Sequence, residues 1–227
     1  MSEQIQIDDI MVSVRRNARA RRMTLRVPRS GGDAVLTLPM KASLKAGREF
    51  VQSKVDWLRK AVAAMPEPQL VQDGVALPIS GHLRQVRALP VKRVQLQGDL
   101  LAVPNGRPVG LSLQAWLRHR THAALCEAVD RHAGNLGRQP GAMSLRDTRS
   151  RWGSCTSDGR LMFSWRLAMA PPEVLDYVAA HEVAHLAHMD HSPRFWAQVE
   201  ALMPGHAPHR AWLRRHGAEL QAWRFKD

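Results

Sequence analysis

The sequence has few cysteines and no long apolar run, and each of these scarcities excludes a class of protein. Its 227 residues contain two cysteines, Cys126 and Cys155, which are too few for a disulfide framework. No apolar run approaches the roughly 18 to 20 residues of a membrane-spanning helix. Residues 1–9 are polar and acidic, unlike a signal or transit peptide. We therefore expect a protein of the reducing cytoplasm that has no membrane partner.

Acidic residues are also scarce relative to basic ones. Lysine and arginine number 33 against 20 aspartates and glutamates, which gives a net charge of +13. The sequence pI is about 11.2. Because 44% of the residues are hydrophobic, the chain has the composition of a globular protein. A charge this high makes a nucleic acid or another polyanion a candidate partner.

The charge is concentrated in the first part of the chain. Residues 1–140 hold 22 basic and 11 acidic side chains, a net of +11, whereas residues 141–227 hold 11 and 9, a net of +2. Between Asp9 and Asp33 there is no acid but there are seven arginines, Arg15, Arg16, Arg19, Arg21, Arg22, Arg26 and Arg29. This Arg-rich part predicts polyanion binding. Seven of the 11 histidines lie within residues 181–227, so the two parts have different chemistry.

Turns rich in proline and glycine divide the sequence and predict two domains. Residues 1–108 combine short runs of strand-forming residues with one helix that Ser43 caps, and residues 104–108 form a turn-rich boundary. Residues 109–227 begin with a long helix, continue with strands over residues 143–146 and 160–167, and end in further helices. The fold class is therefore α+β, with a basic, mainly β N-terminal part and a compact α+β catalytic domain. The strand at residues 161–167 is a candidate edge with which an extended peptide could pair.

The segment His181-Glu182-Val183-Ala184-His185 has the H-E-x-x-H form on a helix that Pro171-Pro172 begins. Histidines four residues apart share one helix face, so both imidazoles can bind one ion. Neutral imidazoles suit Zn²⁺, which catalytic sites hold with three protein ligands and an open water position. The carboxylate of Glu182 then lies beside the zinc-bound water and can take its proton during attack on a carbonyl. The alternative is two histidines and a glutamate on a solvated helix.

A third ligand must come from the histidines that follow. His188 continues the same face, but on a straight helix it lies about 10 Å of rise beyond His181, too far for a shared ion. His191 precedes the helix start at Ser192-Pro193, where a turning chain can fold it back onto the metal. The spacing therefore favours His191. His206 and His209 are fallback ligands, or one of them could donate a hydrogen bond to the developing oxyanion.

The chain resembles the YgjP-like metallopeptidases, compact gluzincin-type zinc hydrolases related to the SprT and Wss1 proteases. The resemblance is specific from about Ser150 to Trp212. It rests on the H-E-x-x-H segment and five others, Arg151-Trp152-Gly153-Ser154-Cys155, Trp165-Arg166-Leu167, Ala170-Pro171, Asp176-Tyr177-Val178 and His191-Ser192-Pro193-Arg194-Phe195-Trp196. It implies a gluzincin-like fold, a peptide or protein substrate, His181, His185 and His191 as zinc ligands, and Glu182 as the catalytic residue.

Four other residues have a weaker claim to function. Cys155 could bind metal, although three histidines already complete a catalytic set. Trp152 and Trp165 could line a substrate cleft or simply bury area. Tyr177, the only tyrosine, lies one turn before His181, where core packing or a hydrogen bond to a ligand is expected rather than catalysis.

Three functions compete. The first is a zinc peptidase in which Zn-bound water, activated by Glu182, attacks a peptide carbonyl. The second is a zinc-dependent phosphohydrolase acting on a nucleotide, which the absence of a Gly-rich phosphate loop weakens. The third is a nucleic-acid-binding module with a structural zinc, which requires a closed four-ligand site, for which His188 is a candidate fourth ligand.

Overall fold

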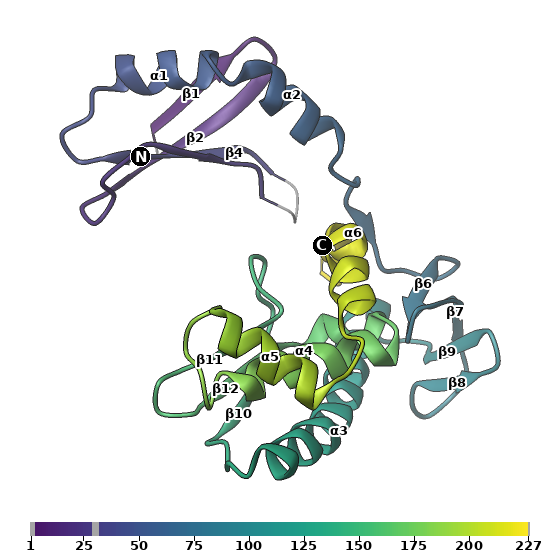
Figure 1. Ribbon diagram of the computed structural model, residues 1–227. Coiled ribbons are helices and arrows are strands. Elements are labelled where there is room, and N and C mark those ends of the chain that lie inside the picture. The colour runs from purple at the N-terminus through teal and green to yellow at the C-terminus, as the bar shows by residue number, and fades with distance from the viewer. Residues whose placement is uncertain (1–2, 29–31, 227) are drawn as a thin grey trace. The chain divides into compact units, whose positions relative to one another are not determined.

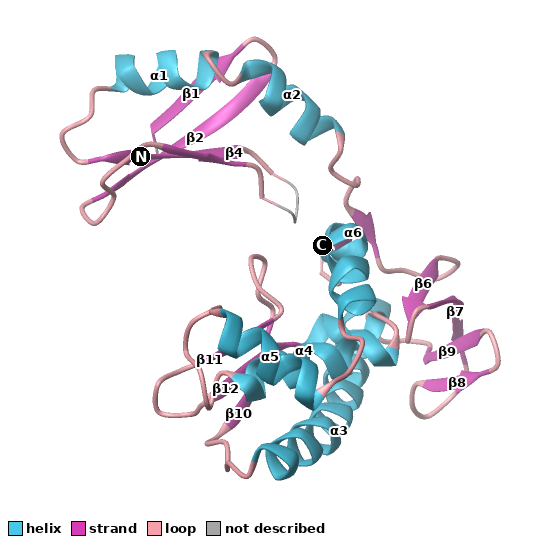
Figure 2. Cartoon of the chain, viewed as in Figure 1, coloured by secondary structure: helices cyan, strands magenta, loops and turns pink. Residues whose placement is uncertain are grey.

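The computed structural model describes residues 3–28 and 32–226. By its internal contacts the chain divides into two compact units, Met1–Pro68 and Gln69–Asp227. Figures 1 and 2 show both units as mixtures of helices and small sheets. The α+β class expected from the sequence is thus confirmed. Each unit has its own hydrophobic core and is described by itself.

The first unit contains a four-stranded sheet with the order β1-β2-β4-β3. Strands β2 and β4 are parallel, and the two outer pairs are antiparallel. Alternate residues of β4 are buried, which is the pattern of a strand with one face on a core. The strands are β1 (Glu3–Ile7), β2 (Ile10–Asn17), β3 (Thr24–Arg26) and β4 (Ala34–Pro39).

Two helices, not the single one expected, follow this sheet. They are α1 (Leu44–Gln52) and α2 (Val55–Ala63). Ser43 caps α1 by accepting a hydrogen bond from the Ala46 amide, as predicted. The expectation of one helix was wrong because the chain breaks after α1: the Ser53 hydroxyl donates to the Phe50 carbonyl, and Lys54 leaves helical geometry at φ −118°.

The second unit begins with a small sheet of order β6-β7-β9-β8, and the short strand β5 pairs with β13 near the end of the chain. The strands are β5 (Gln69–Leu70), β6 (Ala76–Ile79), β7 (His82–Leu89), β8 (Gln95–Gln97), β9 (Leu100–Pro104) and β13 (Trp223–Arg224). After β6, the Ser80 and Gly81 amides donate to the carbonyls of Ala168 and Met169. These contacts tie residues 69–108 to the rest of the second unit.

The division at residues 108 and 109 expected from the sequence falls inside this second unit. Buried side chains such as Leu77, Val86 and Leu101 belong to the same hydrophobic cluster as Leu113 and Leu117. Because one core spans residue 108, the compact units separate after Pro68 instead. Residues 104–108 therefore form a turn inside the second unit and do not mark a boundary between units.

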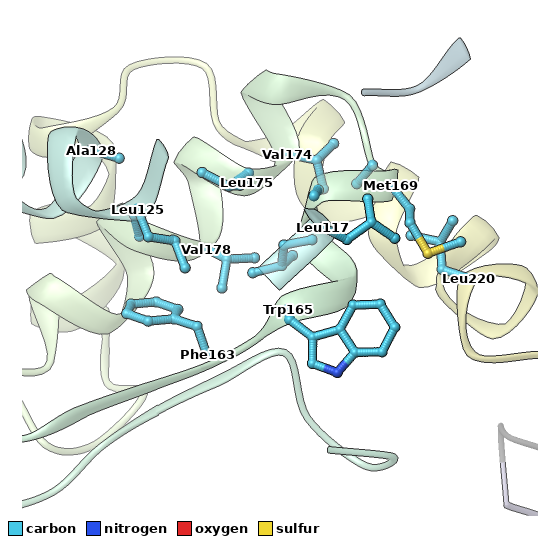
Figure 3. Close-up of a cluster of buried hydrophobic side chains, with 14 of the residues drawn as sticks. Leu117, Leu125, Ala128, Phe163, Trp165, Met169, Val174, Leu175, Val178 and Leu220 are labelled. Carbon is cyan, nitrogen blue, oxygen red and sulfur yellow. The ribbon is translucent and has the colours of Figure 1, made fainter. Parts of the chain in front are cut away.

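The remainder of the second unit packs around the helix that carries the H-E-x-x-H segment. Its elements are α3 (Val109–Leu136), β10 (Met143–Arg146), β11 (Gly153–Cys155), β12 (Leu161–Ser164), the 3-10 helix η1 (Trp165–Met169), α4 (Pro172–Ala184), α5 (Pro193–Leu202) and α6 (Ala207–Ala222). Figure 3 shows the core, in which Val174, Leu175 and Val178 of α4 lie among side chains of α3, β12 and η1. This packing surrounds α4 with apolar groups.

Helix α4 is buried on nearly every side. Pro171 and Pro172 start it, as expected, and residues 177–180 are all buried. Trp165 is fully buried and packs edge-on against Phe225 at 4.8 Å between ring centroids, so it is a core residue and does not line a cleft. Arg166 donates to the carbonyls of Leu220 and Trp223, which holds the end of α6 against η1.

The three-stranded sheet beside α4 has the order β10-β12-β11. Strand β12 is therefore central, hydrogen-bonded on both sides, and it ends at Ser164. The hypothesis that residues 161–167 form a free edge for a peptide was wrong for this reason.

None of the helices in the described part of the chain has the length and apolarity that a membrane crossing requires.

Candidate metal centre

Three histidines converge at the end of α4. His181 and His185 come from α4 and its C-cap, and His191 comes from the loop before α5. One nitrogen from each imidazole lies within 4.8 Å of the others. The ring centroids are 5.1, 5.2 and 4.9 Å apart. The structure thus brings together the three residues that the sequence predicts as ligands.

The turn after α4 explains why His191 joins the group and His188 does not. Helix α4 ends at Ala184, so the chain leaves the helix axis before His188. The His185 Nδ1–H donates to the main-chain carbonyl of His188 at 2.9 Å, which leaves its Nε2 for an ion. Ser192 N donates to the Asp190 carboxylate and shapes the turn that returns His191. His188 therefore supports the site through its main-chain oxygen, which accepts the hydrogen bond from His185, and its imidazole is not part of the group.

Two aromatic side chains of α5 hold the imidazoles in place. Phe195 is fully buried, and its ring lies 4.9, 4.4 and 4.8 Å from those of His181, His185 and His191. Trp196 flanks two of them, at 5.6 Å from His181 and 5.9 Å from His191. Such packing fixes ligand rotamers and keeps bulk water from one side of the group.

The chemistry of the three imidazoles suits a zinc ion. Burial lowers the pKa of His181 to about 3 and also lowers the pKa of His185, so both are neutral and can ligate. The two Nε2 atoms of His181 and His191 lie 3.2 Å apart, close to the ~3.3 Å that tetrahedral bonds of ~2.0–2.1 Å impose on two ligands. The neutral imidazoles of His181 and His185 and the spacing of the two Nε2 atoms therefore fit a bound metal ion.

Glu182 follows His181 on α4, and its side chain is almost wholly buried. Burial raises the pKa of Glu182 to about 8, an effect that the positive charge of nearby Arg151 opposes. Gly153 of β11 lies against the carboxyl group so closely that a Cβ at this position would be 2.5 Å from Glu182 Oε1. The missing side chain of Gly153 is therefore the space that the carboxyl group occupies.

Of the two fallback histidines, only His206 is packed into the site's surroundings. Its Nδ1 lies 2.7 Å from the Glu200 carboxylate, and its ring stacks at 5.8 Å on both Tyr177 and Trp196. Tyr177 in turn meets His181 edge-on at 5.9 Å, and burial raises its pKa to about 12. His206 does not belong to the group of three. A hydrogen bond from His206 to a developing oxyanion stays a prediction.

The remaining candidates lie outside the metal group. Cys155 donates a hydrogen bond to the Thr156 carbonyl, and burial, with a smaller effect of Glu182, raises the pKa of its thiol to about 11. A thiol that holds its proton so firmly is a poor metal ligand. Trp152 packs beside Gly217 of α6.

The contact of Gly153 with Glu182 was not predicted from the sequence, because no periodicity links residues so far apart along the chain.

Three comparisons with known proteins bear on this arrangement. A family model described as "YgjP-like, metallopeptidase domain" matches residues 21–216, so the chain belongs to the YgjP-like metallopeptidase family. The resemblance stated from the sequence motifs is confirmed, and the protein is a hydrolase of the metallopeptidase class. No curated protein matches the chain. A solved structure, the crystal structure of the metallopeptidase zymogen of Pyrococcus abyssi abylysin, matches 40% of this chain and 93% of its own, with 21% identity and a TM-score of 0.36.

Proposed function

We propose that this protein is a zinc-dependent peptidase of the H-E-x-x-H type, with His181, His185 and His191 as metal ligands and Glu182 as the catalytic residue. The observation that carries the proposal is the convergence of His181, His185 and His191, whose imidazole nitrogens lie within 4.8 Å of one another, at the end of a helix that also buries the side chain of Glu182. Zinc at that point would supply a Lewis acid for a carbonyl oxygen and would lower the pKa of a water molecule.

The chain's own residues move the protons. Glu182 takes a proton from the water that attacks the peptide carbonyl, and it later gives this proton to the leaving amine. It must therefore be ionised at the start, and a bound cation and Arg151 both favour the ionised form over the buried acid. Gly153 leaves the space that the carboxyl group fills, since a Cβ at this position would lie 2.5 Å from Glu182 Oε1.

A structural zinc is the less well supported alternative. It requires a fourth protein ligand, and the group of metal-binding side chains in the described part of the chain holds three. His188, the candidate fourth ligand, is not part of this group, and its main-chain carbonyl accepts a hydrogen bond from His185. Three ligands leave an open position for water and substrate, as a catalytic site requires.

The substrate class is tested by assaying two kinds of product separately. The zinc-loaded protein is incubated with a set of unstructured peptides and with nucleoside triphosphates, and new amino termini and released phosphate are measured. We expect peptide cleavage that a chelator abolishes and no phosphate release above that of the chelated control. Phosphate release without peptide cleavage would contradict the peptidase and establish the phosphohydrolase.

The Gly153→Ala substitution is expected to lower peptide hydrolysis by about 100-fold, because the new Cβ must displace the Glu182 carboxyl group by roughly 1 Å. The zinc content should stay at the wild-type level, since no ligand moves. The measurement is kcat on one peptide together with the thermal midpoint of unfolding. Gly134→Ala is the matched control, because a Cβ there meets nothing within 4 Å. Full activity of the Gly153→Ala protein would show that the contact with Glu182 has no catalytic role.

The first unit is proposed to bind a nucleic acid or another polyanion. The six of its clustered arginines that lie in the described residues are all exposed, namely Arg15, Arg16, Arg19, Arg21, Arg22 and Arg26, and Arg29 lies outside the described residues. Affinity for a mixed oligonucleotide should fall steeply with added salt.

We also propose a cytoplasmic location, supported by two cysteines that are both free thiols.

A further inference from the structure

An arginine-lined groove lies on the face of the three-stranded sheet opposite to Glu182. The groove has a volume of about 590 Å³ and carries Ser144, Met162 and Ser154 at matching positions of β10, β12 and β11. Four arginines and no acidic residue line it, and these are Arg146, Arg149, Arg151 and Arg160. We call it the arginine groove. Its positive charge favours the approach of an anion.

Most of the positive charge in the arginine groove is unpaired. Arg160 forms an ion pair with Asp158 at 2.8 Å. Arg146, Arg149 and Arg151 form no ion pair with any carboxylate in residues 3–28 and 32–226. Guanidinium groups without an internal partner, gathered around one groove, favour recognition of a carboxylate from outside.

The groove adjoins a free strand edge that also reaches the catalytic residue. Strand β11 pairs with β12 on one side and with no strand of the described chain on the other. Ser164 N donates to Trp152 O, and Thr156 N donates to Arg160 O, so hydrogen-bonded pairs alternate along this ladder. The amides and carbonyls of Gly153 and Cys155 therefore point to the free edge, where an added strand could pair with them.

Side chains of an added strand would alternate between two environments. Opposite Gly153 and Cys155 they share the face of the sheet that meets Glu182. Opposite Ser154 they share the face that opens into the arginine groove. Only alternate residues of a bound peptide would therefore meet the arginines.

We propose that the arginine groove binds an acidic side chain of the peptide substrate, the one that lies opposite Ser154 when the peptide adds to the free edge of β11. The inference rests on the proposed peptidase function and names its substrate class. A single-stranded nucleic acid is a poorer fit, because no aromatic residue lines the groove for bases to stack on. A peptide carboxylate needs only the guanidinium groups and the hydroxyls that line the groove.

The test uses a neutral fluorogenic peptide in which a single Glu is moved along the sequence, with Gln and Lys peptides as matched substrates. We expect Glu at one position to raise kcat/KM about tenfold over Gln at the same position. In the Arg146→Gln/Arg149→Gln protein this preference should disappear, while kcat/KM for the Gln peptide stays at the wild-type level. The control protein, Arg93→Gln/Arg107→Gln, removes the same charge from exposed positions outside the groove and should keep the preference.

Binding separates failure of this proposal from failure of the peptidase proposal. The zinc-loaded Glu182→Gln protein is titrated with the Glu and Gln peptides, which needs no turnover. Tighter binding of the Glu peptide that requires Arg146 and Arg149 supports the groove, even if the wild-type protein cuts no peptide and the peptidase proposal fails. Equal affinities, or equal kcat/KM values for Glu and Gln at every position, overturn the groove. An oligonucleotide that displaces the Glu peptide better than polyglutamate of equal charge also overturns it.

Discussion

The zinc-loaded Glu182→Gln protein is expected to keep its metal and to hydrolyse peptides about 100 to 10,000 times more slowly than the wild-type protein. Glutamine has nearly the same shape as glutamate but cannot take a proton from water. Because the carboxyl group at this position is buried and its pKa is raised to about 8, the substitution also removes a group that is costly to ionise in the metal-free fold. The measurements are kcat and zinc per chain.

The control for this prediction lies on the same helix. Glu173 is exposed in the first turn of α4, so Glu173→Gln removes the same charge away from the metal group. Its activity should equal that of the wild-type protein. A Glu182→Gln protein that keeps more than about a tenth of the wild-type kcat would exclude Glu182 as the catalytic base.

Replacement of His191 by alanine is expected to weaken zinc binding by more than about 100-fold, beyond the loss usual for residues that only support a ligand. The remaining pair, His181 and His185, gives two ligands where a catalytic zinc requires three. Peptide hydrolysis should fall with the metal content. The measurement is the affinity for zinc in competition with a chromophoric chelator, with activity assayed on the same samples.

His188 provides the matched comparison. It is three residues from His191, and its backbone carbonyl accepts the hydrogen bond from His185, which an alanine would preserve. The His188→Ala protein should therefore bind zinc and hydrolyse peptides at close to wild-type levels. Zinc loss in His188→Ala with retention in His191→Ala would reverse the assignment of the third ligand.

Local patterns were enough to predict the helix of the site. Pro171-Pro172 marks its start, and the spacing of His181 and His185 places two imidazoles on one face. The rise of a helix argued against His188 as the third ligand. In the structure α4 ends before His188, and a nitrogen of His191 lies within 4.8 Å of nitrogens of His181 and His185. These features depend on residues that are near each other in the chain.

Features that depend on distant residues could not be predicted in the same way. The close approach of Gly153 to Glu182 and the pairing of β5 with β13 arise from tertiary packing, for which one sequence has no periodic signal. The central place of β12 depends on which strands flank it. The extent of the second unit likewise follows from a core shared across residue 108, whereas turn-forming residues mark only a change of direction.

The central claim is that three histidines hold one zinc ion and leave a position open beside Glu182. Anomalous scattering at the zinc edge from crystals of the zinc-loaded protein tests it most directly. We predict one peak about 2.0–2.1 Å from a nitrogen of each of His181, His185 and His191, with a water or substrate atom as the fourth ligand. A peak elsewhere, or a fourth protein ligand that closes the site, would contradict the account.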